Sequence, residues 1–123
     1  LRAAGISGTI LVLSDPLHPR LQDALDHDLT LTVGDVDFAA RLLSHPTRSH
    51  ETFKVHVKVD TGLTRFGLPM SRVEEVMSLL ARSPNIRVDG IYSHLCGTFQ
   101  DDEESNAFTR RQVDTFNLLL DRL

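Results

Sequence analysis

The chain has 123 residues, enough for one domain with a hydrophobic core. Hydrophobic residues make up 41% and charged residues 24%, a globular composition that argues against disorder or a fibre. The net charge is −4 without any lysine or arginine run, so we expect no nucleic-acid partner. No apolar run approaches the roughly 18 residues that span a bilayer, so we expect no membrane partner. The single cysteine, Cys96, cannot form an internal disulfide, which favours a reducing, cytoplasmic compartment.

The first part of the chain predicts a strand followed by a helix. Residues 10–13 form a short apolar run, which is typical of a strand buried on both faces. Asp15, Pro16 and Pro19 are residues that open helices, and an apolar stripe continues the predicted helix to His27.

A second strand and helix follow directly. Residues 29–33 alternate with a period of two and predict a strand. Asp35 is the predicted N-cap of a helix over residues 36–44, and Pro46 ends that helix.

The central segment, residues 55–67, reads VHVKVDTGLTRFG. Three valines alternate with a histidine, a lysine and an aspartate, so its first half predicts a strand with one apolar and one polar face. Gly62 and Gly67 then predict a tight turn that places Arg65 just past the carboxyl end of the strand.

The last part of the chain predicts a helix, a strand and another helix. Ser71 and Glu74 form a capping-box pattern before a helix that ends ahead of Pro84. Residues 86–95 predict a strand with His94 near its carboxyl end. An acidic loop over residues 101–104 precedes the final helix, whose expected inward-facing side chains are Phe108, Val113, Phe116, Leu119 and Leu120.

This order predicts an α/β fold with a parallel sheet, built from about four strand–helix units of about 30 residues each. A dinucleotide-binding fold would carry a glycine-rich fingerprint after the first strand, and residues 14–17 have none. A (β/α)8 TIM barrel needs no such fingerprint and carries its chemistry at the carboxyl ends of its strands. We therefore predict a partial TIM barrel. Because the chain ends inside an amphipathic pattern, we expect an internal piece of a longer protein.

Three residues are candidates for chemistry at that end of the sheet. Lys58 is a surface lysine unless its strand lies in a closed barrel, where a buried ammonium needs neutralisation or modification. Arg65 is either a surface turn residue or a fork for a carboxylate or phenolate. His94 is either a structural or a catalytic histidine. Asp60-Thr61-Gly62 also matches the aspartic-protease triplet, but Leu63 and the helical flanks argue against that class.

Residues 55–67 resemble the central motif of the alanine racemase family, H-L-K-x-D-T-G-M-x-R-x-G. Residues 88–95, VDGIYSHL, resemble the next strand of that family, E-G-I-[FY]-[ST]-H-[FL]. Gln112 and Phe116 are placed like the Q-x-x-x-F pattern of its following helix. The resemblance covers essentially the whole chain, and it identifies residues 1–123 as an internal fragment of the family's N-terminal barrel domain, which binds pyridoxal 5'-phosphate (PLP).

The resemblance also implies roles for the candidate residues. Arg65 matches the arginine that contacts the cofactor's phenolic oxygen and the substrate carboxylate. Lys58 matches a lysine that is often carbamylated, and the carbamate would pair with Arg65. His94 matches the histidine beside the cofactor, bonded to a catalytic tyrosine from the partner subunit of a homodimer. No metal is implied.

Two features depart from the family pattern. The Schiff-base lysine and the catalytic tyrosine belong to segments outside these residues, so we expect residues 1–123 alone to be inactive. Thr64 stands where the family often has glycine, and residues 97–100 differ from the usual C/A-T-A-D segment.

The resemblance implies racemisation of L-alanine to D-alanine by the full-length protein, an isomerase of cell-wall precursor synthesis. The alternatives are a serine or broad-specificity amino-acid racemase, and a PLP-binding barrel without racemase activity.

Overall fold

The computed structural model describes residues 1–14, 21–97 and 102–123. Its elements, in chain order, are a short 3-10 helix at Arg2–Ala4, β1 at Ile10–Val12, α1 at Leu21–Asp26, β2 at Leu29–Val33, α2 at Val36–Ser44, β3 at Phe53–Asp60, β4 at Leu68–Pro69, α3 at Met70–Ala81, β5 at Ile86–Ser93 and α4 at Glu103–Leu120. The predicted start of the first helix at Asp15, Pro16 and Pro19 lies outside the described residues, as does residue 101 of the acidic loop.

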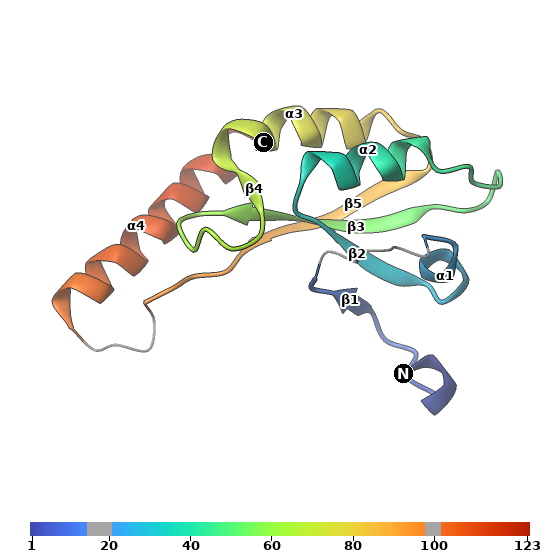
Figure 1. The fold of residues 1–123 in the computed structure, drawn as a ribbon, viewed down its shortest axis with the longest axis horizontal. Helices are drawn as coiled ribbons and strands as arrows, with labels where there is room; N and C mark the ends of the chain where they lie inside the picture. Colours follow the sequence, from blue (N-terminus) through green and yellow to red (C-terminus); the bar gives the residue numbers. More distant parts are fainter. Residues whose placement is uncertain (15–20, 98–101) are drawn as a thin grey trace.

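The strands form one sheet in which every pairing is parallel (Figure 1). β3 is the centre of this sheet, because β5 pairs along one of its edges from Phe53 to Val59. The other edge is shared: β2 pairs with residues 54–57, and the short β4 pairs with residues 59–60. An all-parallel sheet with intervening helices confirms the predicted α/β class and is consistent with part of a TIM barrel.

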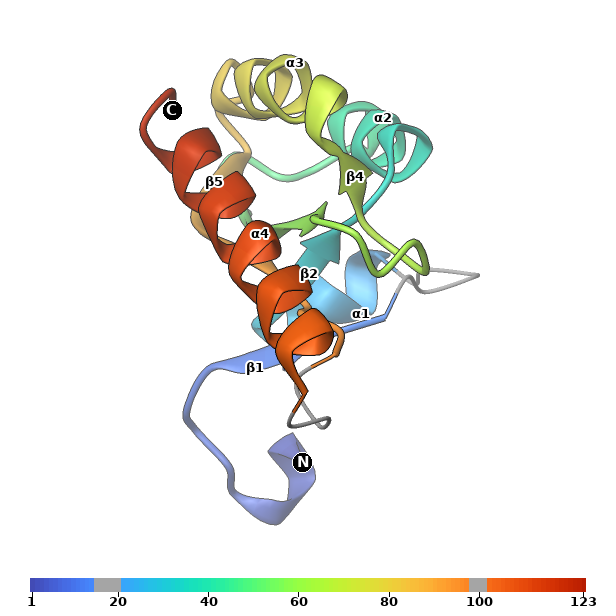
Figure 2. The same ribbon diagram turned by 90° about the vertical axis from the view of Figure 1, so that its left-hand side faces the viewer.

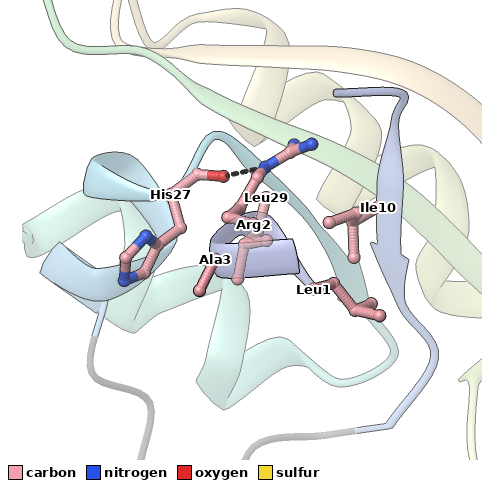
Figure 3. Close-up of a pocket in the computed structure, with 6 residues that line it drawn as sticks. All are labelled: Leu1, Arg2, Ala3, Ile10, His27 and Leu29. Atoms are coloured by element: carbon pink, nitrogen blue, oxygen red, sulfur yellow. Dashed lines mark hydrogen bonds between the residues drawn. The ribbon is translucent and has the colours of Figure 1, made fainter. Parts of the chain in front are cut away.

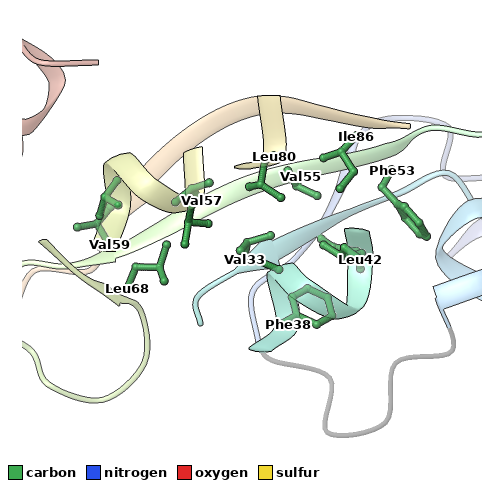
Figure 4. Packing of buried hydrophobic residues seen from close by; sticks show 14 of the residues in the cluster. Val33, Phe38, Leu42, Phe53, Val55, Val57, Val59, Leu68, Leu80 and Ile86 are labelled. Carbon is green, nitrogen blue, oxygen red and sulfur yellow. The ribbon is translucent and has the colours of Figure 1, made fainter. Parts of the chain in front are cut away.

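The hydrophobic core lies on one face of the sheet, beneath α2 and α3 (Figures 1 and 4). The three valines of β3 are completely buried there, in one cluster with Phe38 and Leu42 of α2 and Leu80 of α3 (Figure 4). Asp35 caps α2 as predicted, since its Oδ1 accepts a hydrogen bond of 2.7 Å from the Phe38 backbone N–H. The outer helical layer therefore forms as the sequence periodicity indicates.

Four local predictions were wrong. Residues 10–13 are not a strand buried on both faces, because β1 covers Ile10–Val12 at the edge of the sheet, is only half-buried, and leaves Leu13 63% exposed. Ser71 lies inside the first turn of α3 and makes no cap, because β4 brings the chain directly into the helix at Met70. Strand β5 ends at Ser93 and not at residue 95. In α4, Val113 and Leu120 are 38% and 42% exposed, because the stripe facing the sheet is formed by Gln112, Phe116 and Leu119.

Among residues 1–14, 21–97 and 102–123, no helix is long and apolar enough to cross a membrane. The same residues contain no cluster of three or more histidine, cysteine or acidic side chains arranged to hold a metal ion.

Candidate functional site

The face of β3 opposite the valines carries the polar side chains His56, Lys58 and Asp60. Lys58 is 6% exposed, and in the sheet register it stands beside Tyr92 of β5. The alternation of the strand therefore sends one buried ammonium to the side of the sheet away from the α2–α3 layer.

A cavity of about 520 Å³ lies at the carboxyl ends of the strands on this side. It is lined by Leu13, Ser14, Lys58, Arg65, Phe66, Tyr92 and His94. The structure thus brings the three residues singled out by sequence into one pocket. Lys58 lies at its buried side, whereas Arg65 and His94 are exposed. Such a volume is in the range of small-molecule sites.

The turn that carries Arg65 is built around Asp60. The Asp60 Oδ1 accepts hydrogen bonds from the backbone N–H groups of Gly62, at 2.9 Å, and Thr64, at 3.0 Å. Burial raises the pKa of Asp60, but these backbone donors outweigh it, so the pKa of this carboxyl group lies below its usual value. Asp60 therefore stays ionised and shapes the loop.

Two backbone features keep the turn close to β3. Gly67 has φ 140°, and a Cβ at this position would lie 2.9 Å from the Asp60 backbone nitrogen, so only glycine fits. Thr64 has φ 54°, a left-handed conformation that is unfavourable for a β-branched residue. Glycine, which the family often has in place of Thr64, would adopt this backbone conformation without strain.

Lys58 is held by the same turn. Its Nζ donates a hydrogen bond to the Phe66 carbonyl oxygen and lies 5.3 Å from the centre of the Phe66 ring. Burial lowers the pKa of Lys58; the Asp60 charge opposes this and the Arg65 charge adds to it. No ion pair involves Lys58 within the described residues. Neither cation of the pocket, Lys58 or Arg65, has a carboxylate partner there.

The Phe66 ring is in turn seated on Gly34, at the end of β2. A Cβ on Gly34 would lie 2.3 Å from the Phe66 Cζ, so the ring occupies the space that a side chain would take. This contact links the end of β2 to the turn after β3.

Sequence reasoning missed a hydroxyl chain that borders the pocket. The Thr32 hydroxyl donates to the Val12 carbonyl oxygen at 2.7 Å and lies 2.9 Å from the Tyr92 hydroxyl. Because the single Thr32 proton is used on Val12, Tyr92 donates to Thr32. The period-two threonines of β2 were the available signal, but nothing in their spacing indicates a partner on β5.

The segment that carries His94 is fixed on both sides. Before it, the Ser93 hydroxyl donates to the Val59 carbonyl oxygen at 2.8 Å and lies 2.7 Å from the Thr61 hydroxyl. After it, the Cys96 backbone is bonded to the Gln112 side chain. His94 therefore projects from a short stretch that is anchored to β3 and to α4.

Charged residues at the opposite, amino-terminal end of the sheet are paired. Lys54 contacts Asp28 at 2.5 Å, and Arg87 contacts Asp89 at 2.6 Å. A second cavity nearby is lined by Leu1, Arg2, Ala3, Ile10, His27 and Leu29 (Figure 3). There the Arg2 guanidinium donates to backbone carbonyl oxygens, including those of His27 and Asp28, both at 2.8 Å. Lys54 and Arg87 thus have carboxylate partners, which Lys58 and Arg65 lack among the described residues.

Comparison with known proteins agrees with the fold. The model of the alanine racemase N-terminal domain matches residues 1–123. An alanine racemase of Oceanobacillus iheyensis is 35% identical over all of the chain and 32% of its own length. One of Prochlorococcus marinus is 38% identical over 98% of the chain and 32% of its own length. The crystal structure of the E. faecalis alanine racemase superposes with a TM-score of 0.90, at 25% identity, over 99% of the chain and 33% of that protein. The chain thus spans about a third of the length of these relatives.

Proposed function

The chain belongs to the alanine racemase family, in the N-terminal domain of that family, and from this premise we propose that the whole protein interconverts L- and D-alanine with pyridoxal 5'-phosphate. The observation that carries the proposal is the single pocket shared by Lys58, Arg65 and His94 at the carboxyl ends of parallel strands.

The residues of the pocket fit this cofactor and substrate. Arg65 supplies a positive charge without a carboxylate partner among the described residues, which suits a phenolate oxygen and an amino-acid carboxylate. Leu13, Phe66 and Tyr92 supply an apolar and aromatic wall for a flat ring. When bound, pyridoxal phosphate delocalises the negative charge left on the substrate α-carbon after a proton is removed.

Arg65 is assigned to binding. Its planar guanidinium presents several N–H donors in one plane, so it can hold the substrate carboxylate and the phenolic oxygen of the cofactor together. This fixes the α-carbon relative to the groups that exchange its proton. Arg65 has no competing hydrogen bond or ion pair in the part of the chain that the structure describes, so its donors are free for ligands.

His94 is assigned to proton handling. A neutral imidazole has one nitrogen that donates and one that accepts a hydrogen bond, and His94 is exposed at the pocket. In the proposed dimer it hydrogen-bonds the catalytic tyrosine of the partner subunit and so tunes the basicity of that phenol. The homodimer and a cytoplasmic location belong to the same proposal; the single cysteine supports the location. Light scattering on the full-length protein tests the dimer.

The proposal includes a carbamate on Lys58. Burial lowers the pKa of this amine, which favours the neutral form that attacks CO2. The nitrogen lone pair forms the N–C bond, one C=O π pair moves onto oxygen, and one proton leaves. The product is an anion beside Arg65, which brings the buried site a countercharge and braces the guanidinium.

The activity is tested with the purified full-length protein and added cofactor. We expect conversion of L-alanine to D-alanine, measured by chiral chromatography, to exceed that of serine and other amino acids. Faster conversion of serine favours the broad-specificity alternative, and absence of any racemisation favours a barrel without this activity.

Arg65→Ala should lower turnover by about 100-fold or more, because the transition-state charge loses its donor. Arg87→Ala is the matched control, since this guanidinium lies at the other end of the sheet. Equal turnover in the two variants removes Arg65 from the site.

The carbamate is tested by carbon NMR after incubation with labelled bicarbonate. We expect one carbamate resonance that is lost in Lys58→Met and retained in Lys54→Met, since Lys54 is paired with Asp28. A spectrum without this resonance would leave Lys58 as an unmodified amine.

A further inference from the structure

Gln112, in the middle of α4, is 1% exposed and forms a matched pair of hydrogen bonds with one backbone residue. Its Oε1 accepts from the Cys96 N–H at 3.1 Å, and its Nε2 donates to the Cys96 carbonyl oxygen at 2.8 Å. The side-chain amide thus bonds to Cys96 as a neighbouring strand would. Few side chains can pair with both backbone groups of one residue, because this requires a donor and an acceptor at the end of the same side chain.

Gln112 also borders the turn that follows β3. A Cβ on Gly62 would lie 3.6 Å from the Gln112 Cγ and 3.3 Å from the Phe108 Cζ, so both side chains of α4 pack on this glycine. The Cys96 Sγ lies 3.5 Å from the Gln112 Oε1 and 3.9 Å from the Gly62 carbonyl oxygen. The Gln112 side chain of α4 therefore contacts both the segment after β5 and the turn after β3.

These two segments carry the residues of the pocket. Cys96 is two residues after His94, and Gly62 is three residues before Arg65. Helix α4 crosses the end of the sheet in front of β5 (Figure 2). Gln112 itself is not among the residues that line the pocket.

We propose that Gln112 is a positioning residue that sets the spacing between His94 and Arg65. The proposal rests on the proposed function, because it assigns Gln112 to the same reaction. Ser93 fixes the near side of His94 through β3, while Gln112 fixes the far side through Cys96, with Thr109 as a weaker donor at 3.3 Å to the same carbonyl. Removing Gln112 would leave the far side of His94 held only by the longer Thr109 bond among the described residues.

The test compares Gln112→Met with Phe116→Leu in the full-length protein with its cofactor. Gln112→Met keeps the length and the apolar packing of the side chain but removes the amide. Phe116→Leu makes a side chain on the same face of the helix smaller and leaves the bonds to Cys96 in place. We expect kcat to fall by about 100-fold in Gln112→Met, as for a misplacement of about 1 Å, with KM less affected. Phe116→Leu should lower Tm by about as much as Gln112→Met does. Its kcat should stay within about threefold of that of the parent.

Hydrogen exchange gives a readout that needs no activity. In Gln112→Met, peptides covering residues 93–97 should exchange faster than in Phe116→Leu, since the Cys96 N–H loses its acceptor. Peptides covering residues 60–67 should follow, because the Cys96 Sγ rests on the Gly62 carbonyl oxygen. Unchanged exchange overturns the proposal, and so does faster exchange with normal kcat. If the parent protein shows no racemase activity, the proposed function fails by itself, and the exchange data still decide whether Gln112 holds both segments.

Gln112→Glu should restore activity at low pH, where its side chain is protonated. A neutral carboxyl group both donates and accepts like the amide, but its ionised form cannot donate to the Cys96 carbonyl oxygen. The ratio of kcat/KM between variant and parent should therefore rise as pH falls. The ionisable groups of the adjoining segments are His94, Cys96, Asp60 and Arg65; they are common to both proteins and cancel in this ratio. A ratio independent of pH would contradict the donor role of Nε2.

Discussion

The two faces of β3 show how one strand divides stability from function. On the face toward α2 and α3, Val55, Val57 and Val59 have no exposed surface. On the other face, Lys58 is almost as buried, yet its ammonium has one carbonyl oxygen and an aromatic ring as its partners among the described residues. The first face stabilises the fold by apolar burial, while the second holds a charge whose burial opposes folding.

The two faces of β3 differ in how strictly they specify their residues. A core face needs only apolar side chains of suitable volume, so its residues are interchangeable within limits. On the polar face, Tyr92 donates to Thr32, which donates to the Val12 carbonyl oxygen, and Lys58 donates to the Phe66 carbonyl oxygen. A buried ammonium without a carboxylate is unfavourable by itself, which indicates that the pocket is shaped for a ligand or a modification.

The largest expected effect is on the helical face. Phe38→Ala should lower the free energy of unfolding by about 3–5 kcal/mol, because this side chain is completely buried between α2 and the sheet. Urea denaturation measures it. Leu43→Ala on the same helix is the control, and with 37% exposure it should change stability by less than about 1 kcal/mol. Equal losses would show that α2 does not distinguish its two sides.

The polar face should respond in the opposite direction. In buffer free of CO2, Lys58→Met should raise the free energy of unfolding by about 1–2 kcal/mol, because it removes a buried ammonium with unsatisfied donors and leaves the packing volume similar. Added bicarbonate should reduce this gain, since the proposed carbamate neutralises the parent lysine. A loss of stability in both buffers would mean that Lys58 supports the fold.

A smaller effect is expected in the turn beside that face. Thr64→Gly should raise the free energy of unfolding by about 0.5–1 kcal/mol, because φ 54° is strained for threonine and allowed for glycine. Thermal unfolding measures the change. Thr115→Gly, inside α4, should instead be destabilising. If Thr64→Gly also destabilises, the threonine side chain must stabilise the turn in another way.

The smallest effect is the acid dependence of the turn. The pKa of Asp60 is below 3.8, the ordinary value for an aspartate, so its contribution to stability is complete above that pH and is lost as the pH falls toward the folded-state pKa. Asp60→Asn should therefore show a shallower loss of unfolding free energy below about pH 4. Asp114→Asn, an exposed carboxylate on α4, serves for comparison. Parallel acid curves for Asp60→Asn and the parent would contradict the role of the Asp60 hydrogen bonds.

Much of the fold could be predicted because its signals are local. The period-two valines of β3, the apolar stripe of α2 and the Asp35 cap each depend on neighbours within a few residues. The errors at Ser71, Val113 and Leu120 have a different origin. Ser71 has the right local pattern, but the pairing of Leu68 with Val59 moved the start of the helix. The exposed positions of α4 depend on which face meets the sheet.

The candidate site also has features that could be predicted from the sequence and features that could not. Lys58, Arg65 and His94 could be singled out because the carboxyl ends of parallel strands meet at one edge, and the strands were visible in the pattern. The Thr32–Tyr92 pair and the bond between Cys96 and Gln112 could not, since their partners are 60 and 16 residues apart.

The sequence alone thus determined the parallel α/β architecture, the apolar and polar faces of β3, and the residues that meet at its carboxyl end. Only the tertiary structure decided how the turn after β3 folds back as β4, which hydroxyl donates to which, and how α4 fixes the segment beyond His94. The physical reason is that periodicity records the face on which a side chain lies, whereas a hydrogen bond depends on distance and direction to an atom of another element.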